Sequence, residues 1–142
     1  MKVKSKQPRK QRKALYNYKN NQRSKLLSTR IADYLREEYG IKRLPIRVGD
    51  QVRVCKGEFK DFEGEALEIT KDLRCRIKEA QFEKTDGTQY HPAIHISNLI
   101  ITKFAKEKKM DPWRVNMIER KAGYRILEEE LVGPKKKKEV EK

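Results

Sequence analysis

The chain has 142 residues, of which 36% are hydrophobic and 40% are charged, and its formal net charge is +15. So little apolar material cannot bury a core along the whole chain, so we expect one domain with extensions. The net charge implies a polyanionic partner, which could be nucleic acid or an anionic membrane. No apolar run approaches the roughly 18 residues of a spanning helix, and the N-terminus has no signal-peptide core, so we expect the partner to be nucleic acid. Two cysteines are too few for a disulfide framework and indicate a reduced, intracellular protein.

The charge is distributed unevenly. Residues 1–30 contain eleven Lys or Arg and no acid, residues 31–102 have a net charge of −1, and residues 103–142 have a net charge of +5. A nearly neutral body is therefore flanked by two basic extensions.

Residues 1–27 are predicted to form an extended basic arm without independent structure, because its like charges repel and its few leucines show no sustained period. The arm mixes cations with tyrosines, a combination that can follow phosphates and stack on bases. A merely solubilising or nuclear-targeting tail is the alternative, although such tails rarely include tyrosine, asparagine and leucine. The arm residues expected to contact RNA are Arg9, Lys10, Arg12, Lys13, Tyr16, Arg23 and Lys25.

Residues 28–44 are predicted to form a short helix and a linker that anchor the arm to the body. Ser28 or Thr29 can cap the start of this helix, and Gly40 marks its end. The face expected to pack on the body carries Ile31, Tyr34 and Leu35.

Residues 45–104 alternate apolar and polar side chains, which predicts short β-strands. The segments concerned are 51–55, 66–70, 74–78, 81–84, 88–91 and 99–102. Asp86-Gly87 predicts a two-residue hairpin turn between the fourth and fifth of them. Short strands at this spacing favour a small antiparallel β-barrel, whose closure would remove exposed sheet edges.

The residues after the strands predict a C-terminal helical extension over 105–127 and a charged mobile tail over 128–142. Asp111-Pro112-Trp113 is a typical helix start, with a capping residue followed by proline. The expected apolar stripe is Val115, Met117, Ile118 and Tyr124, and the side chains expected to remain outside are Arg114, Arg120, Lys121 and Arg125. Packing on the chain's own barrel and docking against RNA or a neighbouring protein are both open.

Catalytic and metal chemistry is not indicated. Cys55, Cys75, His91 and His95 lack the close cysteine pair or helix-face histidines of a zinc site. No phosphate-binding glycine loop, nucleophile elbow or carboxylate pair in an apolar setting is present. We therefore expect no enzyme activity, no cofactor and no small-molecule substrate.

The start of the body resembles a KOW motif. Residues 47–60 read RVGDQVRVCKGEFK and residues 63–66 read EGEA. Each of three glycines is expected where a side chain would not fit. Gly49 turns the chain into the first strand, Gly57 opens the loop, and Gly64 lies at a bend close to the barrel. The loop is expected to offer charge and one aromatic face to RNA through Lys56, Phe59 and Lys60.

Further segments in the same order make the resemblance more specific. They read RKQRKALYN (9–17), LPIR (44–47), KTDGT (84–88), IHISNLIIT (94–102) and IERKA (118–122). Over about residues 7–122 the chain resembles the universal large-subunit ribosomal protein 24 family, in its archaeal and eukaryotic form (number 26 in eukaryotes).

This resemblance implies an SH3-like KOW barrel and a structural role in the large subunit of cytoplasmic ribosomes. It further implies binding to the 5′ region of large-subunit rRNA, a part in early subunit assembly, and a place near the polypeptide exit tunnel. Neighbouring large-subunit ribosomal proteins are the other expected partners. The additional residues expected to contact RNA are Arg47, His95, Ser97, Arg120 and Lys121.

The chain departs from the family pattern at two positions. Asp61 stands where glycine is usual after the loop lysine, and we expect its carboxylate to turn away from RNA. Ile96 stands where the family typically has proline, so the RNA contact that the resemblance implies for His95 and Ser97 is less well supported. Two other classes compete with the ribosomal interpretation, a transcription elongation factor module with a KOW barrel and a soluble RNA chaperone.

Overall fold

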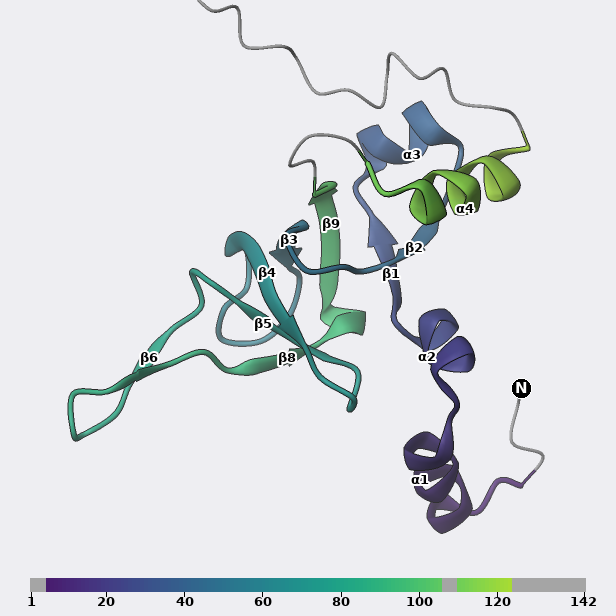
Figure 1. Ribbon diagram of the computed structural model, residues 1–142. Helices are drawn as coiled ribbons and strands as arrows, with labels where there is room; N and C mark the ends of the chain where they lie inside the picture. The colour runs from purple at the N-terminus through teal and green to yellow at the C-terminus, as the bar shows by residue number, and fades with distance from the viewer. Residues whose placement is uncertain (1–4, 106–109, 124–142) are drawn as a thin grey trace, which may run out of the picture.

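The computed structural model describes residues 5–105 and 110–123 (Figure 1). The predicted tail at 128–142 lies outside the described residues, as do Tyr124 and Arg125. The helices are α1 (Pro8–Asn17), α2 (Asn20–Leu26), α3 (Asp33–Tyr39), the 3-10 helix η1 (Ile96–Asn98) and α4 (Pro112–Ala122). The strands are β1 (Ser28–Ile31), β2 (Arg43–Pro45), β3 (Gln51–Val54), β4 (Glu63–Ile69), β5 (Arg74–Ile77), β6 (Phe82–Glu83), β7 (Gln89–Tyr90), β8 (Ala93–His95) and β9 (Leu99–Lys103).

Seven of these strands form one sheet in the order β2-β1-β9-β3-β4-β5-β8, and β6 and β7 form the predicted hairpin, which projects from the body (Figure 1). The register shifts within β3–β9 and β4–β5 mark irregularities that bend a sheet and increase its twist. The mainly β, barrel-like fold class is confirmed. Two details differ from the predicted closed antiparallel barrel. β1 pairs with β9 in parallel, and the end strands β2 and β8 are not paired with each other, so the sheet remains open.

The core forms where the strands alternate, as the sequence predicts. Fully buried side chains at alternating positions are Val52, Val54, Cys75, Ile77, Leu99 and Ile101. The start of β4 passes very close to neighbouring side chains at Gly64. A Cβ there would lie 1.8 Å from Oε2 of Glu79 and 2.7 Å from Cγ2 of Ile77. Any side chain at Gly64 would therefore force its neighbours apart.

The arm contains two helices, so the extended conformation predicted for it is wrong over residues 8–17 and 20–26. Pro8 begins α1, where its missing N–H costs no hydrogen bond, and most residues that follow have high helix propensity. Neither helix has a fully buried residue, but Leu15 of α1 and Leu26 of α2 are half-buried and pack against the core. Local helix propensity thus outweighs repulsion between the like charges.

Residues 28–31 form strand β1, so the prediction that Ser28 or Thr29 caps a helix is wrong. Thr29 is buried, and its hydroxyl lies 2.9 Å from the carbonyl oxygen of Ile96 and 2.6 Å from that of Leu99. The hydrogen-bond partners of β1 lie in β9, some seventy residues later in the chain, so the local sequence pattern could not predict this strand.

Helix α3 starts at Asp33 and ends at Tyr39, just before Gly40 as predicted, and Gly40 has a left-handed φ of +64°. Its buried side chains are Leu35 and Tyr39. Tyr34 is 55% exposed rather than part of the packing face, although its hydroxyl donates to the carbonyl oxygen of Thr102. This contact joins α3 to the end of β9.

Helix α4 begins as predicted, with the Asp111 side chain accepting a hydrogen bond from the backbone N–H of Arg114. Met117 and Ile118 are buried. Arg114 was expected outside and is only 2% exposed, so that expectation is wrong. Within the described residues, α4 therefore packs on the chain's own body.

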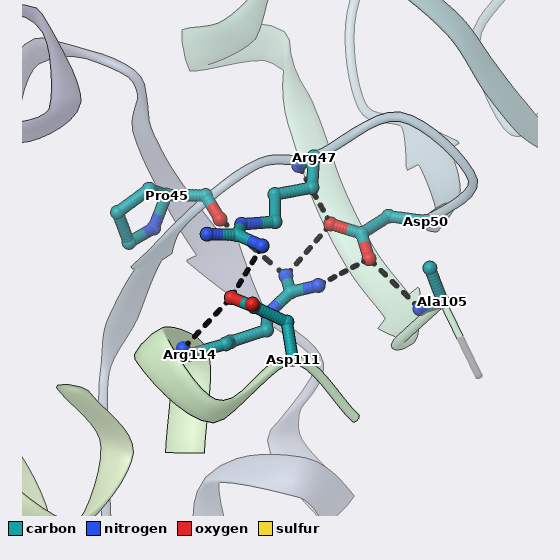
Figure 2. A network of polar contacts seen from close by, with 6 residues as sticks. All are labelled: Pro45, Arg47, Asp50, Ala105, Asp111 and Arg114. Carbon is teal, nitrogen blue, oxygen red and sulfur yellow. Dashed lines mark hydrogen bonds and ion pairs between the residues drawn. The ribbon is translucent and has the colours of Figure 1, made fainter. Parts of the chain in front are cut away.

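Figure 2 shows why Arg114 is buried: its guanidinium pairs with the fully buried carboxylate of Asp50, with Nη1–Oδ1 2.6 Å and Nη2–Oδ2 2.7 Å. The same carboxylate accepts from the backbone N–H groups of Arg47 and Ala105 at 2.8 and 2.9 Å. The guanidinium also lies 4.7 Å from the ring centre of Phe104. One carboxylate thus joins the turn before β3, the chain after β9, and α4.

We predict that Arg114→Met lowers the free energy of unfolding by about 3–5 kcal/mol, because it leaves the Asp50 carboxylate buried without its cation. Adding Asp50→Asn removes the uncompensated charge, so the double variant should regain part of the loss. Arg120→Met, at an exposed position of the same helix, is the matched control and should stay within about 0.5 kcal/mol of the parent. Urea unfolding at pH 7 measures all three. A loss below about 1 kcal/mol for Arg114→Met would contradict this role.

The two cysteines should differ in reactivity. Burial, and then the charge of Asp50, raises the pKa of Cys75 to about 12, whereas Cys55 is half-exposed. A maleimide at pH 8 should modify Cys55 in the folded chain and reach Cys75 only after unfolding. Because Cys75 ionises near 9.0 when unfolded, stability should fall as the pH rises from about 9 to 12. Mass spectrometry of the labelled chain checks the first point, and equal labelling of both thiols would refute it.

Candidate nucleic-acid interface

The predicted RNA contacts of the arm lie on α1. Arg9, Arg12, Lys13 and Tyr16 are spaced by three and four residues, which places them along one side of the helix. All four are exposed, Tyr16 to 69%. Lys10 is also exposed, and residues 5–30 contain no acid. Like charges at this spacing destabilise an isolated helix, so a bound polyanion would stabilise α1.

The two predicted contacts on α2 differ in their environment. Arg23 is half-buried, lines a hollow between α2 and the turn from β4 to β5, and donates from Nη2 to the carbonyl oxygen of Tyr16 at 3.4 Å. It therefore links α2 to α1. Lys25 is exposed and remains available to solvent.

The loop from residue 55 to 62 has two left-handed residues, Gly57 at φ +103° and Asp61 at φ +66°. Hydrogen bonds from Asp61 N to Val54 O and from Val54 N to Phe62 O, 2.8 and 2.9 Å long, close the loop. Aspartate tolerates the left-handed region better than most residues, which explains how it replaces the usual glycine. The Asp61 carboxylate is exposed and lies 4.0 Å from Nζ of Lys60.

The two lysines of the loop are exposed, as predicted, whereas its predicted aromatic side chain packs within the protein. Lys56 and Lys60 are exposed. Phe59 is half-buried and packs edge-to-face on Phe82 of the hairpin, with ring centres 4.7 Å apart. Part of its surface is therefore covered by the hairpin. The exposed rings beside it are Phe62 (48%) and Tyr90 (44%), which contact Phe59 and Phe82 respectively.

His95 and Ser97 contact each other at the start of η1. Nδ1 of His95 lies 2.8 Å from the Ser97 hydroxyl and accepts from the Ser97 backbone N–H at 3.3 Å. Both side chains are exposed. Ile96 between them is buried, and its N–H donates to the carbonyl oxygen of Leu73 at 3.1 Å. Proline at this position could not donate that hydrogen bond.

Three cations predicted from the family resemblance lie near α4, and two of them hold the helix. Arg47 pairs with Asp111 at 2.5 Å and lies over the Trp113 ring, 5.0 Å from its centre. Lys121 donates from Nζ to the carbonyl oxygen of Arg43 at 2.8 Å, and burial lowers its pKa. Arg120 is exposed.

A further group of cations was missed. Arg30, Arg36, Lys42, Arg43 and Arg53 line one hollow beside β1. Net charge gave no signal, because residues 31–102 are nearly neutral overall. The alternation of Arg53 with buried Val52 and Val54, which places it on the outer face, was the available clue.

Among residues 5–105 and 110–123, no three His, Cys, Asp or Glu side chains gather closely enough to hold a metal ion. None of the helices in these two ranges is long and apolar enough to span a membrane.

The comparisons with known proteins agree with the motifs. A family model that describes the eukaryotic ribosomal proteins L26 together with their archaeal L24 counterparts matches residues 5–121. Proteins named "Large ribosomal subunit protein uL24" from Korarchaeum cryptofilum and Sulfolobus acidocaldarius are each 39% identical, over 133 and 137 residues. These alignments cover 93% and 96% of this chain and 97% and 98% of the relatives. A protein of the same name from Sulfurisphaera tokodaii is 43% identical over 121 residues, covering 82% of this chain and 85% of its own. The chain therefore belongs to the archaeal and eukaryotic family of large-subunit ribosomal proteins predicted from its motifs, a family of structural proteins rather than enzymes.

Proposed function

We propose that this chain is a structural protein of the large ribosomal subunit that binds the 5′ region of large-subunit rRNA. In this role it assists early assembly near the polypeptide exit tunnel, in contact with neighbouring ribosomal proteins. The observation that carries the proposal is the acid-free arm, whose helix α1 gathers Arg9, Arg12, Lys13 and Tyr16. Family membership supplies the ribosomal context.

The arm and the body would contribute differently to binding. Cations on the arm neutralise phosphates and release counterions, which provides affinity with little dependence on sequence. Tyr16, 69% exposed, can stack on an unpaired base. The body adds orientation, because Lys56 and Lys60 lie on a loop that Phe59 fixes against the hairpin.

The arm can be tested by charge removal in the full chain. Changing Arg9, Lys10, Arg12 and Lys13 to Gln removes four phosphate contacts at ~0.7 each, so the slope of log K against log salt should become less steep by about 3. Filter binding to a 5′-region rRNA fragment between 50 and 400 mM KCl measures the slope.

The control removes the same number of charges from the body, by changing Lys71, Lys78, Lys84 and Lys103 to Gln. These lysines are exposed, and this variant should change the slope by less than 1. Equal changes in the two variants would mean that net charge, rather than the arm, determines binding.

The ribosomal role makes a separate prediction. In gradient sedimentation at moderate salt, the chain should remain with large subunits, and hydroxyl-radical footprinting should show protection in the 5′ region of large-subunit rRNA. A chain that sediments mostly free of ribosomes would favour an RNA chaperone, and one that follows RNA polymerase would favour a transcription factor.

A further inference from the structure

A hollow of about 350 Å³ lies beside β1, β2, β3 and α3. Five basic side chains line it, together with one acid, Asp33. The basic residues, which we call the basic hollow, are Arg30, Arg36, Lys42, Arg43 and Arg53. All five are exposed, so their charged groups reach solvent.

The strand register places three of these arginines in one row. Arg43 of β2 lies opposite Arg30 of β1, Arg30 lies beside Ile100 of β9, and Ile100 lies opposite Arg53 of β3. Residues paired in this way share a face of the sheet. Like charges directly opposite each other are destabilising, so the Arg30–Arg43 pair costs the free protein stability.

Nearby acids compensate this row only in part, and none among the described residues forms an ion pair with Arg30, Arg43 or Arg53. Asp33 pairs with Arg36, with Oδ1 and Nη1 2.7 Å apart. Glu63 of β4 is in register with Arg53 but makes no ion pair with it within 4.0 Å. In the described part of the chain, no acidic side chain lies within that distance of Arg30, Arg43 or Arg53.

The other arginines of the described body are different. Arg47, Arg76 and Arg114 each pair with a carboxylate, and Arg74 donates to the carbonyl oxygen of Ala93. Arg120 on α4 is the exception, but it stands on a helix surface rather than in a concave group. Guanidinium groups that line one concavity and have no ion-pair partner are suited to phosphate oxygens, which they can bind in a bidentate manner.

We infer that the basic hollow binds backbone phosphates of the rRNA, as a second electrostatic site in addition to the arm. β1 follows α2 directly, so RNA that lies along the arm can continue across Arg30 into the hollow. This inference rests on the proposed function, since it adds contacts on the body to the same RNA.

The test removes the charge of the row in the full chain by changing Arg30, Arg43 and Arg53 to Gln. Three lost phosphate contacts should make the salt slope on large-subunit rRNA less steep by about 2, and the variant should bind several-fold more weakly at 150 mM KCl. Changing the same residues to Lys keeps the charges and should restore the slope.

The matched control changes Lys71, Lys78 and Lys84 to Gln, which removes the same charge from exposed body positions elsewhere. Its slope should stay within 1 of the parent. Equal changes of the salt slope in the hollow and control variants would contradict the inference. So would a parental slope in the hollow variant together with a less steep slope in the arm variant, and in that case the proposed function would still stand. Circular dichroism melting checks that the Gln variants remain folded.

A second readout does not depend on rRNA. In the full chain with ¹⁵N-labelled arginine, inorganic phosphate should shift the Nε–Hε resonances of Arg30, Arg43 and Arg53 in a saturable way. Those of Arg74 and Arg76, which already have partners, should shift less. Equal or absent shifts would overturn the inference even if the chain binds rRNA through the arm.

Discussion

The buried carboxylate of Asp50 is the interaction on which the arrangement of the body depends. It is fully buried, and it accepts hydrogen bonds from two backbone N–H groups and from both terminal nitrogens of Arg114. A buried ion is tolerated only when it is paired and its oxygens are hydrogen-bonded, and both conditions hold here. The KOW-like motif and α4, distant in sequence, are therefore one structural unit, and α4 is part of the body rather than an appendage.

This network also shows what the sequence could and could not predict. The strands were predictable because Val52, Val54, Leu99 and Ile101 alternate with polar residues, and a period of two needs no tertiary information. Arg114 was placed on the wrong side of its helix, since a charged residue is expected outside unless its partner is known. That partner is 64 positions away. Residues 28–31 were misassigned for the same reason, because their partner strand lies far along the chain.

The candidate RNA interface was predictable only in part. Cations of the arm were found because no acid interrupts them, and their helical arrangement was missed because repulsion was weighed above local propensity. The basic hollow was missed because counting charges over residues 31–102 averages opposite signs, whereas the sheet separates them by face. Arg47, Lys121 and Phe59 were predicted to contact RNA, and each also makes an internal contact that side-chain type alone does not reveal.

The parallel pairing of β1 with β9 bears on the order in which the protein can form. β1 occupies residues 28–31 and β9 residues 99–103, so this part of the sheet is completed only after almost the whole body has been synthesised. Contacts so distant in sequence form slowly, whereas the hydrogen bonds of α1 lie within residues 8–17 and do not depend on the rest of the body. During translation the arm therefore leaves the ribosome before the body, and it is available to a polyanion while the domain that orients it is still incomplete.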